Sequence, residues 1–329
     1  MELNKLLERQ IKRYLKNTDP SENPELKELL FAISLAYQHH EEDRQLVERA
    51  LEISSKELSQ SNSELRKASI IIEEKNRDLI SSLEYAKLVQ DSLLAGESSL
   101  KSIFPESFIF NKPKEIVSGD FYWIFSREDT TYLASVDCTG HGVPGAFMSV
   151  ISYRFLNQAV RDAGLEKLTD ILYFLNSEIK YTISDKIEND ENKNALDISM
   201  VKIDKRNERF EFAGVGQKNL YSIDNEIIEL NGDKFHIGQN LNPGEHIIST
   251  QEFEIGKNST LYMYSDGFQD QFGGADSKKF GTKRLKELIS SINHLDILSQ
   301  KTTIENTFLT WKNENDQVDD TFLMGIKLS

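Results

Sequence analysis

The chain has little of what several protein classes require. Its 329 residues contain a single cysteine, Cys138, which excludes an intrachain disulfide and fits a reducing compartment. No apolar run approaches the ~18 residues of a membrane span, so we expect no membrane insertion. The N-terminus, MELNKLLERQIKRYLK, is charged throughout and lacks the apolar segment of a signal peptide. Together these absences predict a cytoplasmic protein.

Positive charge is also scarce. Lysine and arginine total 39 against 54 aspartate and glutamate residues, which gives a formal net charge of −15. Such a surface repels nucleic acid and anionic membranes, so we expect neither as a ligand. A phosphorylated ligand would be repelled as well unless metal ions supplied local positive charge. The hydrophobic share of 38% is ordinary for a protein with a packed core, and the length suggests about two domains.

The first hundred residues contain almost no glycine and are helical in pattern. Leucine and isoleucine recur at helical spacing up to Leu15, two prolines interrupt the pattern at Pro20 and Pro24, and a second periodic run starts near Glu25. Residues 1–41 are therefore predicted to form a helical hairpin.

A seven-residue repeat follows over residues 42–98. The apolar positions are Leu51, Leu58, Leu65, Ile72, Leu79, Ala86 and Leu93. If they occupy heptad position d, position a holds Ser55, Asn62, Ser69, Asn76, Leu83 and Gln90. Such a repeat indicates a coiled coil, and a polar a position favours a weak two-stranded coil of fixed register. We expect a homodimer through this segment, ending near Gly96; the alternative is a long helix packed on its own hairpin.

Residues 99–329 have the composition of an α+β domain. Short aromatic and β-branched runs predict strands at 121–125, 132–136, 198–203, 209–213, 219–223, 260–264 and 322–326. Helices are predicted at 143–163, 168–183, 283–292 and 302–311. Many strands with two separated helix pairs predict a layered sandwich in which helices flank packed antiparallel sheets.

Several aspartates stand where predicted strands begin or end. Asp120 precedes one strand, Asp137 and Asp266 each follow one, and Asp319 and Asp320 precede the last. Each alone is typical of a turn or a helix cap. Brought together, four carboxylates cannot all stay ionised without cations, and oxygen donors favour Mg²⁺ or Mn²⁺ over zinc. Two such ions about 3.5–4 Å apart can activate a water and hold a phosphoryl group.

Four sequence motifs contain these aspartates and resemble the motifs of a known protein family. They are VSGDFYW at 117–123, DCTGHGVPGAFMS at 137–149, YSDGF at 264–268 and QVDD at 317–320. In this order they resemble the SpoIIE-like branch of the PPM metal-dependent protein phosphatases, over about residues 100–329. FAG at 212–214 and FHIG at 235–238 match softer patterns of the family.

The resemblance implies a sandwich fold with a centre of two Mg²⁺ or Mn²⁺ ions at one edge. In the family pattern, Asp137 bridges both ions and the backbone carbonyl of Cys138 is a further ligand. Asp120 holds one ion partly through water, and Asp266 and Asp319 complete the other. Asp319 rather than Asp320 matches the ligand position. The arginine that grips phosphate in eukaryotic relatives has no counterpart, so metal would hold the phosphate.

Two further residues keep alternatives open. His141, in the glycine turn, is either a leaving-group acid or water anchor, or a turn histidine bonded to backbone. Asp197, before the strand at 198–203, matches a family-like position, but bonding to nearby backbone is the favoured interpretation.

The predicted function is a protein phosphatase that hydrolyses phosphoserine or phosphothreonine of a partner regulator of the anti-anti-sigma type, by a metal-activated water. One alternative is a catalytically silent scaffold that kept the fold and binds a partner; the intact aspartates argue against it. Another is a metal-dependent hydrolase of a different phosphoester. Residues 1–98 would dimerise or receive a signal, which the coiled coil would pass to the catalytic domain.

Overall fold

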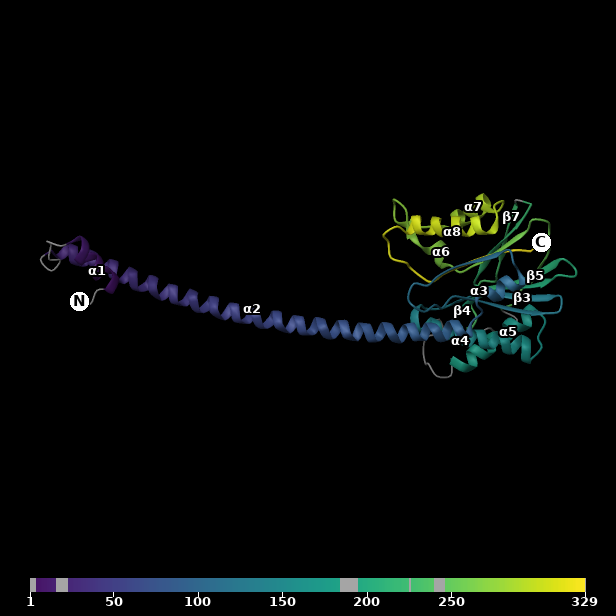
Figure 1. Cartoon of the computed structure of the whole chain (residues 1–329), viewed down its shortest axis with the longest axis horizontal. Helices are drawn as coiled ribbons and strands as arrows, with labels where there is room; N and C mark the ends of the chain where they lie inside the picture. The colour runs from purple at the N-terminus through teal and green to yellow at the C-terminus, as the bar shows by residue number, and fades with distance from the viewer. Residues whose placement is uncertain (1–3, 16–22, 184–194, 225, 240–245, 329) are drawn as a thin grey trace. The chain divides into compact units, whose positions relative to one another are not determined.

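The computed structural model describes residues 4–15, 23–183, 195–224, 226–239 and 246–328. Contacts divide the chain into two units, Met1–Leu79 and Ile80–Ser329 (Figure 1).

The first unit contains two helices that contact each other. Helix α1 (Lys5–Tyr14) begins at Asn4, whose side chain accepts a hydrogen bond from the backbone N–H of Leu6. The N–H of Asn4 in turn donates to Ser34 Oγ over 2.8 Å, and Leu7 and Leu30 are both buried. The two helices thus pack as a hairpin, as the proline-interrupted pattern predicts.

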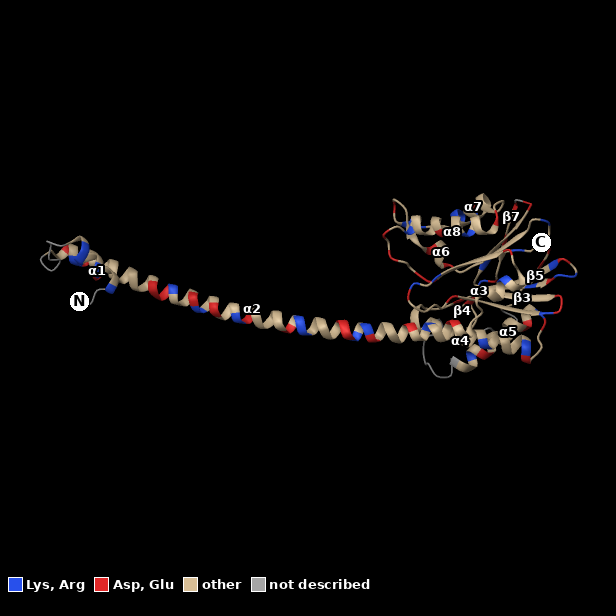
Figure 2. Ribbon diagram, in the orientation of Figure 1, with Lys and Arg blue, Asp and Glu red and all other residues tan. Residues whose placement is uncertain are grey.

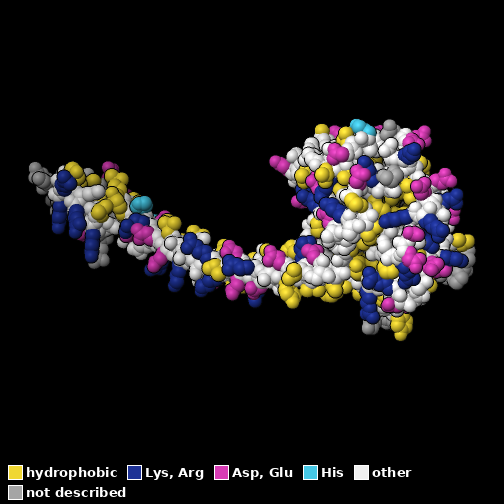
Figure 3. Space-filling model, turned by 45° about the vertical axis from the view of Figure 1, so that its right-hand side comes forward, with side chains coloured by type: hydrophobic (Ala, Val, Ile, Leu, Met, Phe, Trp, Pro, Cys, Tyr) yellow, Lys and Arg dark blue, Asp and Glu magenta, His cyan; other side chains and the backbone are white. Residues whose placement is uncertain are grey.

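Helix α2 (Pro24–Leu93) is continuous over 70 residues, so the second hairpin helix and the heptad segment are one element. Its surface carries charges of both signs along its length (Figure 2), interspersed with hydrophobic side chains (Figure 3). The heptad residues from Leu51 to Leu79 each expose 58–67% of their surface. Among the described residues, no helix combines the length and apolar character needed to cross a membrane.

The second unit is a sandwich of two antiparallel five-stranded sheets. One has the strand order β2-β3-β4-β5-β8 and the other β1-β12-β9-β6-β7. Helices α4 and α5 cover the outer face of the first sheet, and α7 and α8 that of the second (Figure 1).

The strands and helices of the second unit, in chain order, have the following bounds. The strands are β1 (Ser107–Lys112), β2 (Phe121–Arg127), β3 (Thr130–Cys138), β4 (Leu196–Asp204), β5 (Arg209–Val215), β6 (Lys218–Ile223), β7 (Glu226–Asn231), β8 (Gln251–Glu254), β9 (Thr260–Tyr264), β10 (Phe272–Gly273), β11 (Lys278–Lys279) and β12 (Thr321–Lys327). The helices are α3 (Glu97–Ile103), α4 (Gly142–Asn157), the π-helix η1 (Gln158–Asp162), α5 (Leu168–Ile183), α6 (Gly267–Asp270), α7 (Gly281–Ile292) and α8 (Ile297–Lys312).

Side chains along each strand alternate between the two faces of its sheet, and this alternation forms the hydrophobic layers of the sandwich. In β2, Phe121 and Trp123 pack toward α4 and α5, whereas Tyr122 and Ile124 pack between the two sheets. Side chains that follow one another in a strand point to opposite faces, so each sheet supplies both an outer and an inner core. The central layer contains the fully buried Leu133 and its neighbours. The predicted α+β sandwich is therefore confirmed.

Every strand and helix predicted in this unit is present. The sequence did not predict β1, β7, β8, the short pair β10 and β11, or helices α3 and α6. Helix α2 ends at Leu93, and Gly96 is the N-cap residue of α3.

Candidate metal centre

The aspartates converge because strand ends meet at one edge of the sandwich. In the first sheet, the cross-strand pair Phe121 and Val136 places the start of β2 beside the end of β3. In the second, the pair Leu323 and Tyr264 places the start of β12 beside the end of β9. Asp120 and Asp137 thus come from one sheet, and Asp266, Asp319 and Asp320 from the other.

Hydrogen bonds join the two sheet ends. Ser265 Oγ donates to Asp120 Oδ2 across the sandwich and accepts the N–H of Phe322 over 3.0 Å. The carboxylate of Asp320 is buried and accepts the N–H groups of Lys114 and Gly119, each over 2.7 Å. Asp320 therefore holds the loop that carries Asp120, and its two oxygens are already engaged. This assigns it a structural part and leaves Asp319, as predicted, the better candidate ligand.

The fold raises the pKa of three of the candidate ligand carboxyl groups. Burial is the main cause for Asp120 and Asp137, whose pKa values lie well above the usual range, and neighbouring aspartates raise both further. The pKa of Asp266 rises from 3.8 to about 6, first through desolvation and then through the charge of Asp319, although the residue as a whole is exposed. The groups are thus close enough for their charges to oppose one another.

Glycines let the backbone of the DCTGHG turn approach the Asp120 loop. A Cβ on Gly119 would lie 2.9 Å from the carbonyl oxygen of Gly140 and 3.0 Å from that of Cys138. On Gly145 it would lie 2.2 Å from the Gly140 oxygen. Only glycine fits at these positions. The carbonyl oxygens of the turn therefore lie beside the loop that precedes Asp120.

The thiol of Cys138 is unsuited to metal binding. It is buried, and burial together with Asp137 raises its pKa well above the usual range, so the thiol stays protonated. As predicted, only the backbone carbonyl of this residue is a candidate ligand.

The donor set fits hard divalent cations. Within the described part of the chain, no lysine or arginine forms an ion pair with the carboxylates of Asp120, Asp137, Asp266 or Asp319. Among the same residues, no three His, Cys, Asp or Glu side chains close around one point as a preformed cage. Carboxylate and carbonyl oxygens with incomplete protein coordination suit Mg²⁺ or Mn²⁺, since Mg²⁺ retains several water ligands.

His141 and Asp197, the two residues with open alternatives, each contact an ionisable side chain. His141 Nδ1 lies 2.5 Å from Glu115 Oε1, so this exposed histidine links the glycine turn to the Asp120 loop rather than bonding to backbone. Asp197 is hydrogen-bonded to His236 Nδ1 rather than to nearby backbone. Neither the role of Glu115 nor the pairing of His236 with Asp197 was predicted from the sequence, because the members of the two pairs lie 26 and 39 residues apart.

The end of α2 contacts the same loop within the second unit. Gln90 is buried, and its Nε2 donates to Ser118 O over 2.6 Å and to Ser149 Oγ of α4 over 2.8 Å. Gln90 was predicted as a coiled-coil seam residue, and this part of the prediction is wrong, because the side chain is buried against Ser118 and Ser149 of the second unit. A cavity of about 160 Å³ lies between this part of α2 and Asp120.

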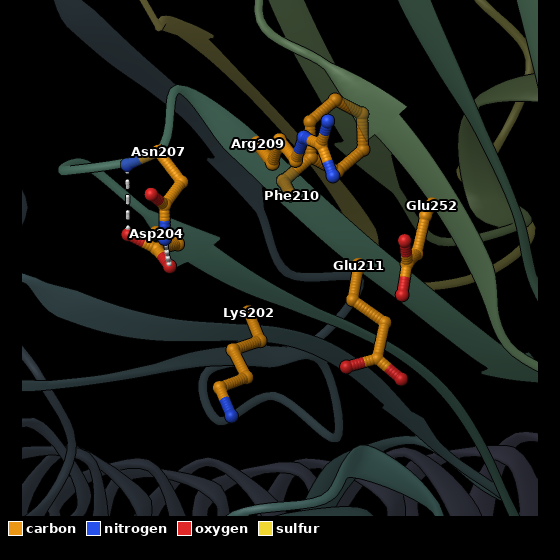
Figure 4. Close-up of a pocket in the computed structure, with 7 residues that line it drawn as sticks. All are labelled: Lys202, Asp204, Asn207, Arg209, Phe210, Glu211 and Glu252. Atoms are coloured by element: carbon orange, nitrogen blue, oxygen red, sulfur yellow. Dashed lines mark hydrogen bonds between the residues drawn. The ribbon is translucent and has the colours of Figure 1, made fainter.

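A larger surface hollow lies away from the aspartates. It measures about 560 Å³ and is lined by Lys202, Asp204, Asn207, Arg209, Phe210, Glu211 and Glu252 (Figure 4). The carboxylate of Asp204 accepts hydrogen bonds from the backbone N–H and the side-chain amide of Asn207. None of the lining residues belongs to the candidate centre. The volume of a hollow therefore does not identify the metal-binding site in this protein.

Comparisons with known proteins identify the family and the fold of the second unit. The family model described as Stage II sporulation protein E (SpoIIE) matches residues 127–329. The SiaA-PP2C domain of Pseudomonas aeruginosa is 27% identical, with a TM-score of 0.70 over 77% of this chain and 98% of that domain. No curated protein sequence matches the chain.

Two more distant structures show the shared fold. The PP2C phosphatase domain of SpoIIE from Bacillus subtilis, with a fragment of its regulatory domain, has a TM-score of 0.55 at 15% identity, over 68% of this chain and 62% of that one. The RsbU and RsbW domains of Rv1364c from Mycobacterium tuberculosis have a TM-score of 0.53 at 15% identity, over 68% and 60%. The fold predicted from the motifs is confirmed.

Proposed function

The chain belongs to the SpoIIE family and is a protein serine/threonine phosphatase, and we propose that Asp120, Asp137, Asp266 and Asp319 bind two Mg²⁺ or Mn²⁺ ions. With these ions bound, the site would hydrolyse phosphoserine or phosphothreonine of a partner regulator. The observation that carries this proposal is electrostatic. Desolvation and the charges of neighbouring aspartates raise the pKa of Asp120, Asp137 and Asp266, and within the described residues no lysine or arginine forms an ion pair with these carboxylates.

The residues divide into those that would hold metal and those that hold these ligands in place. Asp137, Asp266, Asp319 and the carbonyl of Cys138 are the proposed ligands, with Asp120 acting partly through water. Bound divalent ions would lower the pKa of a water and neutralise the phosphate. Ser265 fixes the Asp120 carboxylate by its hydrogen bond. His141 remains a candidate to anchor water or to donate a proton, held by Glu115.

The partner is proposed to be a phosphorylated regulatory protein of the anti-anti-sigma type, by family resemblance. The strongly acidic surface supports a protein substrate over nucleic acid. A cytoplasmic location stays a prediction that follows from the cysteine content.

A homodimer through α2 is proposed on the exposure of its heptad residues. Leu51, Leu58 and Leu65 expose 65–67% of their surface in the single chain, which a second helix would cover. Because Gln90 faces the catalytic unit, the coil would end before it.

Gln90 is the proposed contact through which α2 affects the metal centre. Its amide bonds Ser118, two residues before Asp120, and Ser149 of α4. We expect Gln90→Leu to raise the Mn²⁺ concentration for half-maximal activity by about tenfold, the lower range for outer-shell partners. Ser92→Ala, an exposed position on the same helix, is the matched control. An unchanged metal requirement in Gln90→Leu would contradict this coupling.

The function is tested by hydrolysis of p-nitrophenyl phosphate with Mn²⁺, with and without chelator. We expect activity in the unaltered protein, its loss with chelator and its loss in Asp137→Ala. Asp129→Ala, in the β2–β3 turn at the other end of the same strands, should keep full activity. Activity that survives both the chelator and Asp137→Ala would reject the mechanism. No activity under any metal would favour the scaffold.

A further inference from the structure

A histidine and a carboxylate form a pair at the border of the candidate centre. Asp197 is the second residue of β4, and the β3–β4 register places it directly opposite Asp137. Its Oδ1 is hydrogen-bonded to His236 Nδ1. Directly opposite residues on antiparallel strands have Cβ atoms about 4.5–5.5 Å apart. The pair therefore lies next to the proposed bridging ligand.

The surrounding backbone fixes both side chains. Gly216 has φ +76°, and a Cβ there would lie 2.0 Å from Asp197 Oδ1, so the backbone packs directly against the carboxylate. On the histidine side, Ile237 exchanges two 3.0 Å hydrogen bonds with Leu196, the residue before Asp197. Gly238 donates to Asn176 Oδ1 over 2.8 Å. The histidine is thus held at the start of β4.

The pair leaves one imidazole nitrogen available. Nδ1 is engaged by Asp197, and no described residue forms a hydrogen bond with Nε2 of His236. The His236 side chain is 48% exposed and that of Asp197 only 25%, so the carboxylate lies inward and the imidazole can meet a ligand. A carboxylate that orients an imidazole through Nδ1 is the arrangement that catalytic histidines use to exchange protons at Nε2.

We infer that His236 donates a proton from Nε2 to the serine or threonine oxygen that leaves phosphorus, and that Asp197 is its positioning residue. The inference rests on the proposed phosphatase function. In this step the oxygen of water forms a bond to phosphorus while the phosphorus–oxygen bond to the side chain breaks. The leaving oxygen takes the Nε2 proton. One proton of the attacking water passes to solvent, the other stays on the phosphate, and the imidazole regains a proton from solvent.

An alkyl leaving group makes such a donor valuable. A serine alkoxide is a strong base, so its departure is slow unless a proton arrives with it, whereas p-nitrophenolate leaves unaided. A protonated imidazole also adds positive charge where the chain offers little. The charge of Asp197 contributes to the raised pKa of both Asp137 and Asp266, which agrees with its place beside the centre.

The alternative donor, His141, has weaker geometric support. Its partner Glu115 belongs to the loop before Asp120, and the pair joins two loops instead of standing opposite a proposed ligand. Its role as a link between loops is sufficient to explain the contact. His236 is therefore the better candidate for the leaving group.

The test compares leaving groups in the full chain with Mn²⁺. His236→Gln should lower kcat for a synthetic phosphoserine peptide and for phenyl phosphate by about 100-fold or more, the usual contribution of a general acid. Hydrolysis of p-nitrophenyl phosphate should be nearly unchanged. Asp197→Asn should show the same pattern to a smaller degree. His294→Gln, an exposed histidine after α7, should match the unaltered protein on all three substrates.

The outcomes separate this inference from the function beneath it. Equal losses of His236→Gln on all substrates, or no loss on the peptide, would overturn the proton donor. Equal losses in Asp197→Asn that are restored by more Mn²⁺ would assign the pair to metal binding and overturn it as well. If the unaltered protein hydrolyses none of the three substrates, both the proposed function and the inference fail. If the unaltered protein hydrolyses all three but His236→Gln does not affect the poor leaving groups selectively, the proposed function stands and only the inference fails.

Discussion

The long helix and the sandwich use leucine in opposite ways. In the sandwich, Leu133, Leu261 and Leu323 are fully buried within one chain. Along α2, Leu58 and Leu65 expose 65% and 67% of their surface. Burial of apolar surface is the main stabilising term in folding, so the sandwich carries its own stability while the heptad row lacks it. The difference shows that the sandwich buries its leucines within one chain, whereas the heptad row would need a second chain to bury its own.

The largest expected effect comes from removing two leucines of the heptad row. Leu58→Gln combined with Leu65→Gln should convert a dimer into a monomer, measured by sedimentation equilibrium. Each of the four leucine side chains lost per dimer contributes about 1.5–3 kcal/mol when buried. The dissociation constant should then rise by at least about 10⁴-fold.

Matched changes on the outer face of the same helix are the control. Lys56→Gln with Lys67→Gln leaves the heptad row intact and should leave the dimer intact. If the unaltered chain is a monomer at high concentration, the prediction of a coiled-coil dimer is wrong. The exposed leucines of α2 would then have to pack against some other surface.

A single core truncation in the sandwich should cost less but act within one chain. Leu133→Ala removes a fully buried side chain between the sheets and should lower the free energy of unfolding by about 2–5 kcal/mol. Leu88→Ala, 62% exposed on α2, should change it by less than about 0.5 kcal/mol. Urea titration followed by circular dichroism measures both. Similar costs at the two positions would contradict the contrast drawn above.

The smallest expected effect is a pH dependence of the metal-free sandwich. Because folding raises the pKa of Asp266 from 3.8 to about 6, the folded state holds the proton more tightly, and this stability is present below about pH 4. It is lost as pH rises through about 6, and the raised pKa values of Asp120 and Asp137 act in the same direction. Thermal unfolding with chelator should therefore show a falling midpoint over this range, and Asp266→Asn should flatten it. A midpoint that rises over the same range would contradict the sign.

The sequence predicted the elements whose side chains repeat regularly. Aromatic and β-branched runs located β2, β3 and β12, and the motifs located Asp120 and Asp137. Strands β7 and β8 were missed because their exposed edge positions carry glutamate and other polar residues, which read as loop.

Contacts between distant segments were beyond the sequence. The heptad frame assigned Gln90 to a coil seam, yet its amide fits a pair of serines that only the folded unit brings together. The same holds for His236, which lies in a loop after β7, whereas its partner Asp197 lies on β4. Periodicity reports which face of an element is apolar, and tertiary packing decides what that face meets.

The most direct test of the central claim is the binding of Mn²⁺ to metal-stripped protein by isothermal titration calorimetry at pH 8. The aspartates are proposed to tolerate one another because divalent cations lie between them, so saturable binding of two ions per chain is expected. Asp137→Ala should lose both ions, since this residue is the proposed bridge. An absence of saturable binding, or binding unchanged in Asp137→Ala, would contradict the account.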